Sequence, residues 1–81
     1  MNLNAIRTAI DQNDPVSLRY AAHSLKGSSA NLGAHILAAY AHEMEDLGRS
    51  GSITGVPSAY QRLLDEFERV KQVLTEESLK A

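Results

Sequence analysis

The chain has 81 residues, of which 8 are basic and 10 acidic, with a formal net charge of −2 and no cysteine. A chain of this length forms one domain at most, covering residues 1–81. The absence of cysteine excludes disulfides and thiolate metal sites. The slight acidic excess argues against nucleic acid as a partner, because a phosphate backbone requires clustered Lys and Arg. No apolar run approaches the roughly 18 residues of a spanning helix, so we expect no membrane insertion.

The first half of the chain predicts two helices. The first is expected at residues 2–12, with Asn2 as its N-cap. Asp14 followed by Pro15 is typical of an N-cap and the first helical position, since proline there loses no hydrogen bond that the helix needs. A second helix should therefore occupy residues 15–32.

In the second half of the chain, glycines mark the predicted ends of helices. Gly33 directly follows the second helix and suits the position just past a helix end. A third helix is expected at residues 34–48, where Gly48 and the glycine and serine residues of the segment 48–52 should end it. A fourth is expected at residues 57–77. No segment shows the alternation typical of a strand.

Apolar side chains recur at spacings of three and four, which gives each predicted helix one apolar face. An all-α, antiparallel four-helix bundle with a shortened first helix is the simplest fold that buries these faces. The first helix would be about 16 Å long and the fourth about 30 Å, so some apolar surface would stay uncovered. A segment preceding this chain, or a second copy in a homodimer, could cover that surface, and the sequence leaves both open. The inward faces of the four predicted helices together comprise Leu3, Ile6, Ile10, Leu18, Ala22, Leu25, Ser29, Leu32, Leu37, Tyr40, Ala41, Met44, Leu47, Tyr60, Leu63, Phe67, Val70 and Leu74.

His23 lies on the outer side of the second predicted helix, roughly 140° from the centre of its apolar face. Arg19 and Lys26 flank it on the same surface, at spacings of four and three. Gly27 follows one turn later, and a glycine inside a helix costs about 1 kcal/mol relative to alanine, so it needs a reason. The missing side chain would leave space beside an exposed imidazole for an anionic group. An exposed helical histidine is nevertheless most often an ordinary surface residue.

The sequence HSLKGSSANLGA at residues 23–34 closely resembles the signature H-x-L-K-G-S-[SA]-x-x-[LVI]-G of the histidine phosphotransfer (HPt) family. Residues 18–22 fit the usual lead-in, and residues 43–45 resemble the family's acidic-apolar-acidic stretch. The resemblance covers about residues 10–50. It implies a phosphorelay intermediate of two-component signal transduction. His23 would accept a phosphoryl group at Nε2 from a receiver-domain phospho-aspartate and pass it to another receiver aspartate.

The resemblance also implies roles for the residues around His23. Lys26 matches the cation that supports the phosphoryl group, and Gly27 matches the glycine that admits it. Glu45 falls where the family often has Gln or Glu reaching toward the imidazole from the third helix. It would orient the ring through the other nitrogen and hold its tautomer.

The expected partners are response-regulator receiver domains. We expect them to dock on a surface around the phosphoacceptor that includes Arg19, Tyr20 and Ala30. Ser28 and Ser29 match small residues that let the second helix pack closely. The chain should need no cofactor of its own, with Mg²⁺ expected on the receiver, and the parent protein is expected to be a hybrid sensor kinase. Cytoplasmic location is expected, with the parent in the inner membrane.

Two other functions were compared with this one. A non-catalytic helical docking or oligomerisation module explains the amphipathic helices but not an exposed histidine beside an interior glycine. We expect no kinase activity of its own, because the chain has no nucleotide-binding loop and is too short for a sizeable pocket. The spacing of His35 and His42 matches no usual ligand pattern, so we expect surface residues and no metal site.

Overall fold

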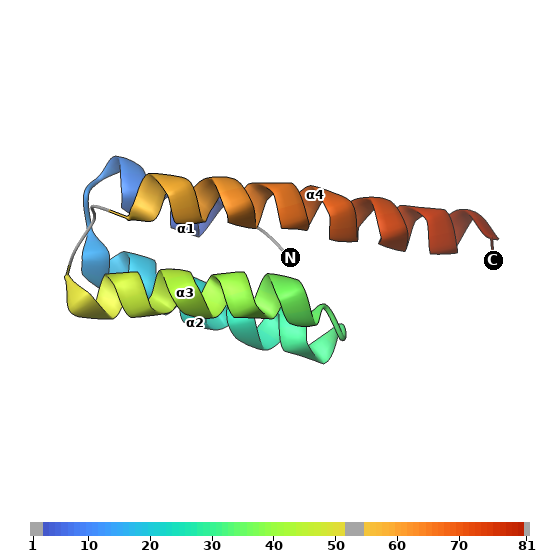
Figure 1. Cartoon of the computed structure of the whole chain (residues 1–81), viewed down its shortest axis with the longest axis horizontal. Coiled ribbons are helices and arrows are strands. Elements are labelled where there is room, and N and C mark those ends of the chain that lie inside the picture. The colour runs from blue at the N-terminus through green and yellow to red at the C-terminus, as the bar shows by residue number, and fades with distance from the viewer. Residues whose placement is uncertain (1–2, 52–54, 81) are drawn as a thin grey trace.

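A computed structural model of the chain describes residues 3–51 and 55–80, with side chains described through residue 74. The described residues form helices α1 at Asn4–Asp11, α2 at Pro15–Asn31, α3 at His35–Ser50 and α4 at Val56–Lys80. The fold is an all-α helical bundle, and consecutive helices run in opposite directions (Figure 1). α2 packs against α1 and α3, and α3 also packs against α4.

Local chemistry sets both ends of α2. The Asp14 side chain accepts hydrogen bonds from the backbone N–H of Ser17 at 3.1 Å and from the Ser17 hydroxyl at 2.7 Å. Pro15 occupies the first turn, as the Asp-Pro pair predicts. At the other end, Gly33 adopts a φ of +76°, which only glycine adopts without strain and which commonly ends a helix. These two signals set the length of α2, and the spacing of its apolar residues sets which side faces inward.

The outer helices differ from their predicted bounds. α1 begins at Asn4 rather than at residue 2, and Leu3 precedes it without a side-chain cap hydrogen bond. The predicted cap, Asn2, lies outside the described residues. α4 begins at Val56, one residue before the predicted start, and Val56 is fully buried. Burial of an apolar side chain in the first turn accounts for the earlier start, because tertiary packing adds to the weak local signal there.

Gly48 does not end α3, which continues to Ser50; the prediction was wrong here. Gly48 is buried against α2. A Cβ at this position would lie 2.7 Å from the backbone nitrogen of Arg19 and 2.8 Å from the carbonyl oxygen of Pro15. The glycine therefore allows the two helix backbones to approach more closely than any side chain would permit.

The core lies between the four helices. Two leucines predicted for the apolar face are exposed instead. Leu32, 54% exposed, follows the last residue of α2, and Leu74, 42% exposed, lies on the far part of α4. The buried apolar residues are Ile6, Ala9, Leu18, Ala22, Leu25, Leu37, Ala41, Met44, Val56, Ala59 and Leu63.

α4 is much longer than the helices beside it. Its 25 residues span about 37 Å, against about 12 Å for the 8 residues of α1. Figure 1 shows α4 continuing past the turn between α2 and α3. Val73 and Leu74 are each 42% exposed on this part of α4. In the described residues, none of the helices combines the length and apolar character that crossing a membrane requires.

Candidate functional site

His23 projects from the outer face of α2. Its side chain is 65% exposed, while Leu18, Ala22 and Leu25 on the other face are buried in the core. This is the orientation that the apolar pattern of α2 predicts. The core contacts therefore hold the helix, and the imidazole remains accessible to another molecule.

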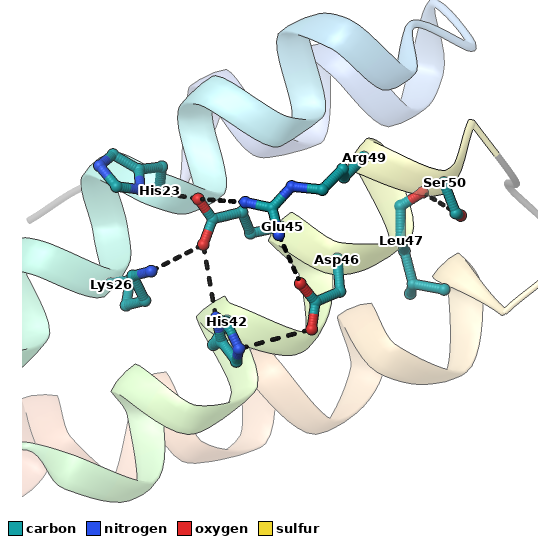
Figure 2. A network of polar contacts seen from close by, with 8 residues as sticks. All are labelled: His23, Lys26, His42, Glu45, Asp46, Leu47, Arg49 and Ser50. Carbon is teal, nitrogen blue, oxygen red and sulfur yellow. Dashed lines mark hydrogen bonds and ion pairs between the residues drawn. The ribbon is translucent and has the colours of Figure 1, made fainter.

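Glu45 of α3 contacts the imidazole directly. Its Oε2 lies 2.7 Å from Nδ1 of His23, across the interface between α2 and α3 (Figure 2). Unlike the histidine, Glu45 is buried, with 3% of its surface exposed. The antiparallel packing of α2 and α3 thus brings together the two residues that the family resemblance paired.

The Glu45 carboxyl group is ionised at neutral pH. Its pKa is lowered from 4.5 to about 2, first because Lys26 donates a hydrogen bond to it. Hydrogen bonds from His23 and His42 and the charge of Lys26 lower the pKa further, against the opposing effect of desolvation. A carboxylate only accepts hydrogen bonds, so Nδ1 of His23 must carry the proton. In the neutral imidazole, the lone pair is then on Nε2.

Lys26 lies one turn after His23, but its ammonium group is bound to Glu45. Nζ donates to Oε1 at 2.8 Å, and the side chain is 33% exposed. The lysine therefore neutralises the carboxylate in this state. It would have to turn outward to contact a group on His23, which its flexible side chain allows.

The surface beyond His23 is open at Gly27. A Cβ built there would meet no atom within 4 Å. Packing within the chain therefore gives no reason for this glycine, in contrast to Gly48. Ser28 is exposed and Ser29 is fully buried, so of the two serines only Ser29 supports close packing of α2.

The predicted docking residues lie along the exposed side of α2. Tyr20 is 65% exposed, and the Arg19 guanidinium lies 5.7 Å from the centre of its ring. Ala30 is also exposed. Val16 is 62% exposed and was not predicted, although it lies four residues before Tyr20 and so on the same face. An exposed stripe follows one side of α2 at spacings of four and three: Val16, Tyr20, His23, Gly27 and Ala30.

Two further residues of α3 belong to this site and were missed. His42 Nδ1 lies 3.4 Å from Oε1 of Glu45, and Arg49 Nη2 lies 3.6 Å from Oε2. Both also contact Asp46, His42 through Nε2 at 3.4 Å and Arg49 through Nη1 at 3.3 Å. Their spacings of three and four from Glu45 are a signal that could have found them. Figure 2 shows His42 between the two carboxylates.

The described part of the chain has no cluster of side chains that would bind a metal ion. No group of three or more His, Cys, Asp and Glu side chains there is placed to hold an ion. His35 and His42 are both exposed, as predicted for surface residues. The polar network around Glu45 is instead one of alternating charges, with a buried carboxylate at its centre.

The comparisons with known proteins give one family. The family model described as "Hpt domain" matches residues 1–73. No curated protein and no solved structure matched the chain. Members of this family are phosphotransfer carriers rather than kinases, and they interact with receiver domains. The chain therefore belongs to the Hpt domain family, the histidine phosphotransfer modules of two-component phosphorelays.

Proposed function

We propose that the chain is a phosphorelay intermediate. In this proposal, Nε2 of His23 accepts a phosphoryl group from the phospho-aspartate of one receiver domain and passes it to an aspartate of another. The observation that carries the proposal is the 2.7 Å contact between Nδ1 of His23 and the Glu45 carboxylate. It leaves a free lone pair on Nε2 of a side chain that is 65% exposed.

The proposed transfer begins when the Nε2 lone pair attacks phosphorus and forms an N–P bond. The P–O bond to the receiver aspartate breaks, and the aspartate leaves as a carboxylate with the electron pair. The proton on Nδ1 stays in place, so the ring becomes cationic, and Glu45 stabilises this charge through the bond that it already accepts. In onward transfer, a carboxylate oxygen of the second receiver attacks phosphorus, and the electron pair of the N–P bond returns to Nε2.

The neighbouring residues have proposed roles in this step. Lys26 turns from Glu45 toward the phosphoryl oxygens and offsets their charge. The open space at Gly27 admits the phosphoryl group and the receiver loop that delivers it. The chain supplies no cofactor in this scheme, and Mg²⁺ is proposed to be bound by the receiver, where it would polarise the phosphoryl group.

Receiver docking is proposed on the exposed stripe of α2. Tyr20 and Val16 are its large apolar side chains, Ala30 lies at its end, and Arg19 borders it. A parent hybrid sensor kinase, held in the inner membrane, and transfer in the cytoplasm are parts of the same proposal. The absence of cysteine suits a reducing compartment.

The proposal is tested by incubating the chain with a radiolabelled phospho-receiver and Mg²⁺. Label should pass to the chain as an acid-labile, base-stable phosphate, which is the signature of phosphohistidine. His23→Gln should abolish labelling, whereas His35→Gln, which removes another exposed histidine, should be labelled like the parent. Equal labelling of His23→Gln and the parent would overturn the proposal.

A non-catalytic docking or oligomerisation module is the alternative. The observation that favours it is the exposure of Val73 and Leu74 on the part of α4 beyond α1, where a second copy would pack in a homodimer. Molar mass from light scattering, measured together with receiver binding, separates the two functions. A stable dimer that neither binds nor accepts label from receivers would favour the alternative.

A further inference from the structure

Among the described residues, four basic groups contact the Glu45 carboxylate, and they divide between its two oxygens. Nδ1 of His23 and Nη2 of Arg49 lie at Oε2, at 2.7 Å and 3.6 Å. Nζ of Lys26 and Nδ1 of His42 lie at Oε1, at 2.8 Å and 3.4 Å. Lys26 therefore makes the short bond to Oε1, and His42 is the second basic group at the same atom (Figure 2).

Phosphorylation of His23 would disturb this arrangement at Oε1. A phosphoryl group on Nε2 brings negative charge to the surface beside Lys26. The phosphoryl oxygens then compete with Glu45 for the Lys26 ammonium group. If Lys26 turns to the phosphoryl group, Oε1 of a carboxylate that is only 3% exposed loses its short bond. A buried charge without its partner is costly, so another cation at Oε1 would stabilise the phosphorylated form.

His42 is placed to be that cation. Its Nδ1 faces Glu45 and its Nε2 faces Asp46, both at 3.4 Å. A neutral imidazole has one N–H, so only the protonated ring can donate to both carboxylates. The other charged groups around it are Lys26 at the shared oxygen and Arg49, which contacts both carboxylates.

Three neighbouring charged or basic groups bind at other atoms than Oε1 of Glu45. On the other flank of His42, Glu43 forms an ion pair with Arg62 of α4. His23 approaches Oε2 rather than Oε1. Arg49 likewise lies at Oε2, so His42 is the basic group of α3 that shares Oε1 with Lys26.

We propose that His42 is a positioning residue for phosphotransfer, which takes over Oε1 of Glu45 when Lys26 turns to the phosphoryl group on His23. This inference rests on the proposed function and adds a linked proton to it. Phosphorylation of His23 and protonation of His42 favour each other, because each strengthens the arrangement in which Lys26 leaves Glu45. By linkage, the coupling must be the same in both directions.

The test is an NMR titration of the histidine ring signals before and after phosphorylation of the chain with phosphoramidate. The titration midpoint of His42 should rise by about 0.2–0.7 pH unit on phosphorylation, the range of a weak ion pair whose histidine is exposed. His35 is the matched control on the same helix, and its midpoint should stay unchanged. An unchanged His42 midpoint in the phosphorylated chain would overturn the proposal.

A variant distinguishes the replacement of Lys26 by His42 at Oε1 of Glu45 from the direct effect of the phosphate charge on His42. In Lys26→Gln, Oε1 has already lost its lysine, so the midpoint of His42 should be raised before phosphorylation, and phosphorylation should raise it less than in the parent. Arg7→Gln, which removes an exposed cation on α1, should behave like the parent. An equal rise on phosphorylation in Lys26→Gln and in the parent would assign the effect to the phosphate charge alone and overturn the proposal.

The proposed function can fail separately. If His23 takes no phosphate from phosphoramidate or a phospho-receiver, the function itself is wrong. In that case the unphosphorylated Lys26→Gln titration still decides whether Lys26 and His42 compete for Glu45. If His23 is phosphorylated and the His42 midpoint does not respond, only the positioning role fails.

Discussion

The backbone of Arg19 passes directly against Gly48. A Cβ at residue 48 would lie 2.7 Å from the Arg19 nitrogen, closer than real side chains come, and 3.0 Å from its Cα. His23 lies four residues after Arg19 on α2, and Glu45 lies three before Gly48 on the antiparallel α3. The same close approach of the two helices therefore sets the distance across which Glu45 reaches the imidazole.

Gly48→Ala should destabilise the fold. The added Cβ meets backbone atoms of α2, so the helices must separate, at a typical overpacking cost of about 1–3 kcal/mol. This outweighs the gain of up to about 1 kcal/mol in helix propensity. Urea denaturation measures the change, and Gly27→Ala is the matched control, because a Cβ there meets nothing within 4 Å. A Gly48→Ala variant as stable as Gly27→Ala would contradict the close approach.

Gly27→Gln should reduce phosphotransfer without weakening the fold. A Cβ at residue 27 would meet no atom within 4 Å, so the fold should tolerate glutamine. Helicity should be unchanged or slightly higher, because glutamine favours the helix more than glycine does. The larger side chain would occupy the space beside His23, and a clash of about 1.4 kcal/mol with the incoming receiver slows transfer about tenfold. Circular dichroism and the rate of label transfer check the two parts. Full transfer by Gly27→Gln would show that this space is not used.

Glu45 should make stability depend on acid pH. Its pKa falls from 4.5 to about 2 on folding, with Lys26 as the first cause. The native state therefore binds fewer protons than the unfolded state between these values. The contribution of the carboxylate to stability is complete above the unfolded pKa of 4.5 and is lost as the pH falls toward 2.

The measurement compares the free energy of unfolding of the parent and of Glu45→Gln from neutral pH down to about pH 2. The parent should be more stable at neutral pH, and the difference should shrink below pH 4.5. Glu68→Gln, which changes an exposed carboxylate on α4, is the control and should alter the profile less. A difference that stays constant across the range would mean that the charge of Glu45 is not what stabilises the site.

Local signals in the sequence predicted the framework well. Asp14 and Pro15 mark the start of α2, and Gly33 marks its end, because capping and left-handed turns depend on a few adjacent residues. The apolar spacing along α2 correctly predicted that His23 faces outward. The all-α bundle followed from the same periodicity.

The errors arose where contacts between residues far apart in the sequence determine the local structure. Gly48 is a residue type that often ends a helix, yet it lies inside α3. It is a glycine because the backbone of α2 occupies the space that a side chain would need. The roles of His42 and Arg49 were missed because they depend on a buried Glu45. Burial of a charged residue is unusual enough that spacing alone does not suggest it. Leu32 matched the apolar pattern, but it follows the end of α2 and faces solvent.

Tyr20→Ala should weaken receiver binding and leave the fold intact. The ring is 65% exposed, so removing it should change the free energy of unfolding by no more than about 0.5 kcal/mol. Exposed aromatic side chains are typical anchors of protein interfaces, and losing one such contact lowers affinity about tenfold. Titration calorimetry with an unphosphorylated receiver domain measures the change.

Val73→Ala is the matched control for Tyr20→Ala. Val73 is also a large apolar residue, 42% exposed, but it lies on α4, away from the stripe of α2. It should bind the receiver like the parent, whereas any self-association through α4 should weaken. If both variants bind the receiver equally well, the stripe on α2 is not the docking surface. If Val73→Ala binds less tightly than Tyr20→Ala, the receiver contacts α4 and the assignment of the two apolar surfaces must be exchanged.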